Sequence, residues 1–325
     1  MNVLVTGGTS LLGAAIARQM HARGDDVTVI QRRPSGLGVR EVLGDIADRR
    51  AVDHAVAGAD VVIHAAAKVT VVGPWTDFEQ TNITGTANVL AASRAANVDR
   101  FVYVSSPSVA HSGSSLVGAP AAPADPSSAR GNYSRSKAVA ELAALDARAS
   151  GFHVVAVRPH LVWGPGDTQL VGRIVSRARQ GRLAIVGSGT ALVDTTYIDN
   201  AADAIVAAAD RASGLSGQVF VVSNGQPRPV RELLDRIALA AELEPPRWRV
   251  PVAVAVGAGH ALERVWERLH REDDPPITSF LAEQLSTAHW FDQRQTRAAL
   301  QWEPAVDLDE GFARLAAWFR ASQDA

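Results

Sequence analysis

Hydrophobic and polar positions alternate in two different ways along the first half of the chain. Short continuous runs rich in valine and isoleucine are separated by longer segments in which apolar residues recur every three or four positions. The runs predict buried parallel strands at Val3–Val5, Val27–Ile30, Val61–His64, Phe101–Ser105 and Val154–Val157. The longer segments predict helices at Leu12–Arg23, Arg50–Ala57, Phe78–Ala96 and Ser134–Ser150. This strict alternation predicts an α/β fold, a doubly wound parallel sheet with right-handed crossovers.

The second half of the chain follows no such regular alternation. Past Arg158 the pattern becomes irregular, and tryptophan and proline become more frequent. The run Val219–Val222 predicts a strand that returns to the sheet, whereas Leu170–Gly181 and Pro245–Trp290 predict a smaller, mostly helical C-terminal lobe. The Ala-, Pro- and Ser-rich stretch Ser112–Arg130 predicts a surface loop.

Composition narrows the class of protein further. A formal net charge of −2 gives no reason to expect a nucleic-acid partner. The absence of cysteine excludes disulfides, thiolate catalysis and cysteine-bound metal, and it fits a reducing compartment. The chain enters its first strand directly, so no secretory signal is expected, and the longest apolar run, near Val250–Ala258, is too short to span a bilayer. We expect a cytoplasmic location, with peripheral membrane contact as an alternative.

A glycine-rich turn follows the first strand and opens the first helix at Thr6–Gly13. This arrangement cradles the pyrophosphate of a dinucleotide, although it can also be a purely structural turn. Gly7 would allow the tight turn, and Gly13 would let the helix pack close to the sheet. Ser10 occupies the middle place, where its Cβ would crowd the pyrophosphate or its hydroxyl would donate to a phosphate. The other cofactor contacts expected in this turn are Thr9, Leu11 and Leu12.

The residues after the second strand bear on the choice between two nicotinamide cofactors. An acidic residue at this place would accept hydrogen bonds from the ribose 2′-hydroxyl. The chain has Gln31, Arg32 and Arg33 instead, and two guanidiniums can pair with a 2′-phosphate. The pattern favours NADP(H), with NAD(H) as the alternative; a solvated turn is the plainer interpretation of the arginines.

A tyrosine and a lysine stand four residues apart where the fourth predicted helix begins. Tyr133 and Lys137 would therefore lie on one helix face. A free phenol has a pKa of about 10, and a neighbouring ammonium lowers it toward neutral pH. The spacing predicts that Tyr133 is the acid or base that exchanges a proton with a carbonyl or an alcohol.

Together these motifs resemble the extended short-chain dehydrogenase/reductase superfamily, over nearly the whole chain. The later segments Arg158–Asp167, Val193–Asn200 and Leu281–Phe291 resemble its 3β-hydroxysteroid dehydrogenase-like branch. Within that branch the chain is most similar to bacterial 2-alkyl-3-oxoalkanoate reductases of long-chain olefin and β-lactone biosynthesis.

The resemblance implies roles for further residues. Ser106 would hydrogen-bond the substrate oxygen, with Ser108 as a second substrate contact, and Asn82 of the Asn-x-x-Gly-Thr motif would support the catalytic site. Lys137 would also hold the nicotinamide ribose. The remaining cofactor contacts implied are Asp45 at the adenine amine, with Ile46 beside it, Ala65 and Ala66 under the cofactor, and Pro159 beside the carboxamide.

Substrate contacts are less defined by the sequence. Lys68 would pair with a substrate carboxylate, or it is an ordinary surface lysine. Bulky apolar residues suit either a lipid-like substrate or core packing: they are Trp163, Trp248, Trp266 and Trp290. A helix over Val252–Leu269 would present a stripe that roofs a long-chain tunnel, docks a partner or touches a membrane; the stripe comprises Leu262, Val265, Trp266 and Leu269. His64, His111 and His160 are interpreted as structural, and no spacing predicts a metal site.

The resemblance implies an NADP-dependent reduction of the 3-keto group of a long-chain 2-alkyl-3-oxoalkanoic acid. The alternatives are a 3β-hydroxysteroid or sterol-4α-carboxylate dehydrogenase, a sugar-nucleotide epimerase, and a non-catalytic cofactor-binding sensor. We expect residues 1–160 to form the dinucleotide-binding domain, with returning segments near 192–232. Residues 161–191 and 233–325 would be mainly the substrate lobe. The expected partners are a lipid-like small molecule, a second copy in a homodimer, and other enzymes of the same lipid pathway.

Overall fold

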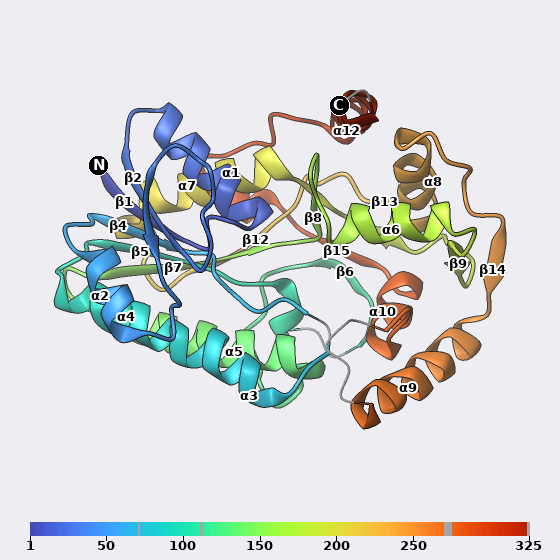
Figure 1. Ribbon diagram of the computed structural model, residues 1–325, viewed down its shortest axis with the longest axis horizontal. Helices are drawn as coiled ribbons and strands as arrows, with labels where there is room; N and C mark the ends of the chain where they lie inside the picture. The colour runs from blue at the N-terminus through green and yellow to red at the C-terminus, as the bar shows by residue number, and fades with distance from the viewer. Residues whose placement is uncertain (71, 111–112, 270–274, 324–325) are drawn as a thin grey trace.

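The computed structural model describes residues 1–70, 72–110, 113–269 and 275–323. Its centre is a wholly parallel, seven-stranded sheet in the order β12-β7-β5-β4-β1-β2-β3 (Figure 1). The strands are β1 (Asn2–Thr6), β2 (Asp26–Gln31), β3 (Arg40–Leu43), β4 (Val61–His64), β5 (Arg100–Val104), β7 (His153–Pro159) and β12 (Val219–Val222). The predicted fold class, a Rossmann-type doubly wound sheet, is confirmed. The short strand β3 was not predicted.

Helices cover both faces of this sheet (Figure 1). One face packs against α1 (Leu11–Ala22) and α7 (Ile198–Leu215). The other packs against α2 (Arg49–Val56), α4 (Gly85–Ala95) and α5 (Gly131–Asp146). Successive residues of a strand point to opposite faces of the sheet. Because helices cover both faces, the side chains on each side are buried. This double burial explains why the strands read as continuous apolar runs in the sequence.

The helix predicted over Phe78–Ala96 is composite. It begins with α3 (Trp75–Phe78), continues as a π-helical segment over Glu79–Thr84, and ends as α4. A π-helical turn is uncommon and often occurs at functional sites. Here it carries Asn82, which is buried.

The C-terminal lobe is mostly helical, as predicted, and has its own apolar core. Its helices are α6 (Leu170–Arg179), α8 (Val230–Ala240), α9 (Val252–Arg268), α10 (Ser279–Ser286), α11 (Arg294–Leu300) and α12 (Leu308–Gln323). Short strands brace them: β8 (Val162–Trp163), β9 (Ala184–Val186), β10 (Leu192–Val193), β11 (Thr196–Tyr197), β13 (Arg228–Pro229), β14 (Trp248–Val250) and β15 (His289–Phe291). None of the helices among the described residues combines the length and apolar character needed to cross a bilayer.

The expectation of a surface loop over Ser112–Arg130 was wrong for part of that stretch. Strand β6 (Leu116–Ala119) pairs in parallel with β15, with Leu116 beside His289. Its partner comes from the C-terminal lobe, and a composition rich in Ala, Pro and Ser carries no signal of such a distant pairing. The segment that precedes α5 is therefore fastened to the lobe.

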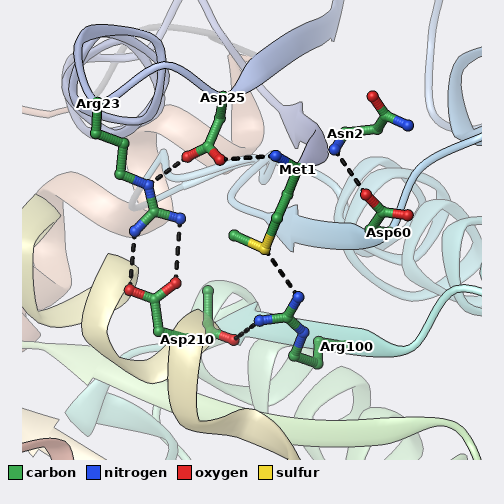
Figure 2. A network of polar contacts seen from close by, with 8 residues as sticks. Met1, Asn2, Arg23, Asp25, Asp60, Arg100 and Asp210 are labelled. Carbon is green, nitrogen blue, oxygen red and sulfur yellow. Dashed lines mark hydrogen bonds and ion pairs between the residues drawn. The ribbon is translucent and has the colours of Figure 1, made fainter.

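Charged groups tie the elements together at the amino ends of the strands (Figure 2). The Met1 amine pairs with Asp25 at 3.1 Å, and Asp25 also pairs with Arg23. Arg23 in turn donates to both carboxylate oxygens of Asp210 on α7, at 2.8 and 3.1 Å. Parallel sheets bind their ligands at the carboxyl ends of the strands. This network lies at the opposite edge of the sheet and is therefore structural.

Candidate active site

The glycine-rich turn between β1 and α1 has no free space for a Cβ at any of its three glycines, Gly7, Gly8 and Gly13. Gly7 adopts a φ of +81°, and a Cβ there would lie 3.0 Å from the Ala66 Cα. A Cβ at Gly13 would overlap the Gly7 carbonyl oxygen. The turn therefore passes close to the segment after β4 and leaves the amide end of α1 open, which fits a dinucleotide pyrophosphate.

Ser10 replaces the middle glycine without strain. It has a φ of −79° and is the N-cap of α1, where its Oγ accepts from the Gly13 N–H at 3.0 Å. Its hydroxyl donates to the Gly7 carbonyl oxygen at 2.8 Å. The single hydroxyl proton is thus used within the turn, so the suggestion that Ser10 donates to a phosphate is not supported. Thr9 and Ser10 are exposed, and Leu11 and Leu12 are half-buried beside them.

Two exposed guanidiniums stand at the carboxyl end of β2. The Arg32 side chain is 75% exposed, and its Nη1 lies 4.0 Å from the Asp45 carboxylate. Arg33 is exposed beside it. Asp45 Oδ1 accepts from the Ala47 N–H at 2.9 Å. Neither arginine is buried or tightly paired, which leaves both available to a 2′-phosphate.

Ile46 has a packing role. It is 5% exposed, and a Cβ added at Gly85 would meet its side chain at 2.6 Å. The Ile46 side chain therefore packs the segment that carries Asp45 against α4.

A buried hydrogen-bond chain links the cofactor turn to the π-helical segment. Thr6 Oγ1 accepts from the Ala66 N–H at 2.9 Å and lies 2.7 Å from His64 Nδ1. Thr86 Oγ1 lies 2.9 Å from His64 Nε2 and donates to the Asn82 carbonyl oxygen at 2.6 Å. The His64 ring must therefore accept at Nδ1 and donate at Nε2. Burial lowers its pKa to about 3, so it is a neutral structural link.

Tyr133 and Lys137 occupy the first turns of α5, as the spacing predicted. Lys137 Nζ donates to the Val104 carbonyl oxygen at 2.7 Å and lies 4.1 Å from the centre of the Tyr103 ring. Burial lowers the pKa of Lys137 to about 7, and the Glu141 carboxylate opposes this shift.

Burial raises the pKa of the Tyr133 phenol, and an interaction with the Ser106 hydroxyl opposes the rise. We expected Lys137 to lower this pKa, but desolvation is the larger effect in the protein without cofactor. The phenol is therefore protonated at neutral pH. This is the form that donates a proton to a carbonyl oxygen.

Ser106 follows β5, and Ser108 lies on the short 3₁₀ turn that comes next, over Pro107–Ala110. Their hydroxyl oxygens are 2.9 Å apart. Ser106 also interacts with the Tyr133 phenol. The structure therefore brings Tyr133 and Ser106, the two predicted contacts of the substrate oxygen, together.

Asn82 holds two parts of the site in place. Its Nδ2 donates to Ser136 Oγ at 2.9 Å and to the Lys68 carbonyl oxygen at 3.1 Å, and its Oδ1 accepts from the Lys68 N–H at 2.7 Å. Ser136 donates to the Tyr133 carbonyl oxygen at 2.8 Å. Asn82 thus joins the segment after β4 to the helix that carries Tyr133.

A buried ion pair behind the site was not foreseen from the sequence. Arg158 Nε lies 2.8 Å from Glu141 Oε2, and Nη2 lies 2.5 Å from Oε1; both side chains are 1% exposed. Arg158 also donates to the Ala122 carbonyl oxygen at 2.7 Å. The pair fixes α5 against β7 and so places Pro159, the last residue of β7. The available signal was the position of Glu141, one helical turn beyond Lys137.

A cavity of about 910 Å³ opens beside Tyr133. This volume is large enough for a drug-sized ligand. Its bulky apolar wall comes from three regions of the chain, at Val69, Trp75, Trp266 and Phe280. Among the predicted tryptophans Trp266 lines this cavity, whereas Trp75 was missed because it precedes the expected helix Phe78–Ala96.

Two predicted substrate contacts, Trp163 and Lys68, are not part of the cavity wall. Trp163 is fully buried in the lobe, stacks on Phe312 with ring centres 4.4 Å apart, and donates to Thr195 Oγ1 at 2.9 Å. It is a core residue, so its prediction as a substrate contact was wrong. Lys68 Nζ lies 3.0 Å from the Asp77 carboxylate and is not part of the cavity wall.

The remaining predicted residues of the lobe are at its surface or in its packing. Trp248 is 71% exposed, and Val265 and Leu269 of the predicted stripe are also exposed. Trp290 packs against Gly118 of β6. The ring of His160 lies against Phe291, with centres 5.1 Å apart, whereas His111 lies outside the described residues.

Residues 3–223 match the NAD dependent epimerase/dehydratase family, and the chain belongs to this family. It is therefore an NAD(P)-dependent oxidoreductase of the extended short-chain dehydrogenase/reductase type, with a small-molecule substrate.

Within this class the chain is 41% identical to a 2-alkyl-3-oxoalkanoate reductase of Stenotrophomonas maltophilia, over 98% of this chain and 99% of the relative. It is 36% identical to a 2-alkyl-3-oxoalkanoate reductase of Shewanella oneidensis, over 97% and 86%. It is 29% identical to the human decarboxylating sterol-4-alpha-carboxylate 3-dehydrogenase, over 97% and 87%.

Solved structures support the same fold. The UDP-glucose 4-epimerase of Thermotoga maritima matches with a TM-score of 0.77 at 21% identity, over 99% of this chain and 100% of that one. At this identity the likeness concerns the fold alone.

Proposed function

We propose that the protein is an NADP-dependent reductase that converts the 3-keto group of a long-chain 2-alkyl-3-oxoalkanoic acid to the 3-hydroxy acid. The observation that carries this proposal is the cavity of about 910 Å³, which is lined by Tyr133 together with the aromatic side chains Trp75, Trp266 and Phe280. The 41% identical relative bears the name of this activity.

The proposed chemistry divides between the cofactor and the chain. When bound, the cofactor supplies the hydride. Tyr133 donates its phenolic proton to the substrate oxygen, and Ser106 hydrogen-bonds the same oxygen. Lys137 holds the ribose, and its ammonium stabilises the phenolate that remains. Asn82 acts through the backbone of Tyr133, by way of Ser136.

The second candidate is a sterol-4α-carboxylate 3-dehydrogenase, which the 29% identical human relative favours. A sterol acid also carries its carboxylate close to the redox carbon, so the two reactions are chemically similar. The candidates differ in the shape of the apolar group that the cavity must accept.

Chain length is the variable that separates the two candidates. Because 3-oxo acids lose carbon dioxide readily, we would measure kcat/KM for oxidation of 2-alkyl-3-hydroxy acids of increasing length. Each buried methylene contributes about 0.8 kcal/mol, or roughly a fourfold gain, until the cavity is full. A 3-hydroxysterol-4-carboxylic acid is the comparison substrate. A flat series beside strong sterol turnover would overturn the proposed substrate and leave the hydride chemistry standing.

Cofactor choice follows from Arg32 and Arg33. Replacing both by Ala is expected to raise the KM for NADPH by roughly 10- to 100-fold and that for NADH much less, because only NADPH carries the 2′-phosphate. Steady-state kinetics with both cofactors measure the difference. Arg94→Ala is the matched control, since Arg94 is exposed in the last turn of α4. If the KM values for NADPH and NADH rose equally, the two arginines would have only a structural role in the turn.

Association and location stay expectations of the same proposal. We expect a homodimer, contact with enzymes of the same lipid pathway, and a cytoplasmic place with peripheral membrane contact as the alternative. Large apolar side chains exposed on β14 and α9 are candidates for such contacts; they include Trp248, Val254 and Val265.

A further inference from the structure

We propose that Arg130 binds the carboxylate of the substrate, and that Glu283 occupies the Arg130 guanidinium until the acid arrives. The inference rests on the proposed function, because it requires a substrate with a carboxylate beside its keto group. It replaces Lys68 as the carboxylate partner, since Arg130 lines the cavity and Lys68 is not part of the cavity wall.

The position of Arg130 suits this role. Arg130 immediately precedes α5 and lines the same cavity as Tyr133, three residues further on. In a 2-alkyl-3-oxo acid a single carbon separates the carboxylate carbon from the keto carbon. A carboxylate receptor must therefore lie close to the proton donor, and Arg130 lines the same cavity at the start of the helix that carries Tyr133.

The charges around the cavity make Arg130 the cation available to an acid. Three carboxylates line it, from Asp77, Glu263 and Glu283, and Arg130 supplies the guanidinium among the described lining residues. Glu263 accepts from the Ser279 N–H and Oγ at 2.8 and 3.0 Å. The Lys68 ammonium already pairs with Asp77, so Arg130 is the guanidinium of the wall that would receive an anionic substrate.

The Arg130–Glu283 pair is built to exchange. It joins the start of α5 to α10 across the cavity wall. The Arg130 side chain is 47% exposed and that of Glu283 is 24% exposed, so the pair is partly solvated and contributes little stability. A guanidinium binds a carboxylate through two parallel hydrogen bonds, so a substrate acid can take the place of Glu283. The first turn of α5 has no side-chain cap, and its positive end lies on the same wall.

Matched substrates test the inference on the full-length enzyme. We would compare a 2-alkyl-3-hydroxy acid with its methyl ester, which has the same chain but no charge, for the wild type and Arg130→Gln. The variant is expected to raise the KM for the acid by roughly 10- to 100-fold and to change that for the ester less than about threefold. Arg130→Lys keeps the positive charge but lacks the planar guanidinium, so its KM for the acid should lie between those of the wild type and Arg130→Gln.

Glu283→Gln provides a change of opposite sign. Removing the competing carboxylate is expected to lower the KM for the acid several-fold and leave the ester unaffected. A role limited to wall structure would shift acid and ester alike in both variants, and that result would overturn the inference while leaving the proposed function intact. If the wild type oxidises neither compound, the proposed function is wrong and the inference falls with it.

Discussion

Tyr133→Phe is expected to lower turnover by about 100-fold or more, because the variant keeps the ring but lacks the proton that the carbonyl oxygen must receive. Burial raises the pKa of this phenol, so the wild type holds the proton at neutral pH. Cofactor affinity should be unchanged, since phenylalanine fills the same volume. Steady-state turnover and cofactor binding, measured on the same preparation, check both expectations.

Tyr197→Phe is the matched control. Tyr197 is buried in the lobe against Trp163, with ring centres 5.5 Å apart and at an edge-to-face angle, away from the cavity wall. The control should keep wild-type turnover. Near wild-type turnover in Tyr133→Phe would remove Tyr133 from the proton-transfer step.

Glu141→Gln is expected to destabilise the fold by about 3–5 kcal/mol, because it leaves the Arg158 guanidinium buried without its counter-charge. Denaturant titration measures the loss. A second effect concerns Lys137, whose pKa Glu141 holds up against burial. Without that carboxylate the pKa should fall below its value of about 7, so the alkaline loss of activity should begin at lower pH.

Asp53→Asn is the control for this pair. Asp53 pairs with Arg49 at 2.7 Å, but both side chains are about half exposed. Exposed pairs typically contribute about 1 kcal/mol or less. A Glu141→Gln variant no less stable than this control would show that water or local rearrangement relieves the charge on Arg158.

The fold could be predicted because its signals are local or nearly so. Strands buried on both faces read as apolar runs, and Tyr133 and Lys137 are neighbours on one helix whatever surrounds them. The pairing of β6 with β15 and the contact of Arg130 with Glu283 join residues far apart in sequence. No local pattern encodes them, so the surface-loop prediction failed and the cavity wall was only partly foreseen.

Single side chains were harder to predict than motifs. As a large apolar residue, Trp163 was expected to line an apolar substrate pocket, yet it stacks on Phe312 in the core of the lobe. From the sequence, the Cβ of Ser10 was expected to crowd the pyrophosphate. In the structure Ser10 has a φ of −79° and caps α1 by hydrogen bonds within the turn, so it fits there without strain. The Tyr133 pKa was judged by its charged neighbour, whereas desolvation dominates. Each of these depends on burial, which a sequence does not specify at the level of one residue.

The position of β12 at the end of the sheet bears on how this chain can be divided. β12 pairs with β7, but the chain reaches it only after passing through β8, α6, β9, β10, β11 and α7. A fragment ending near residue 160 would leave β7 as a bare edge strand and would lack α7, which covers one face of the sheet. Unprotected edges of this kind invite aggregation. The cofactor half is therefore not a detachable module, and during synthesis the ribosome must pass Val222 before the sheet can close.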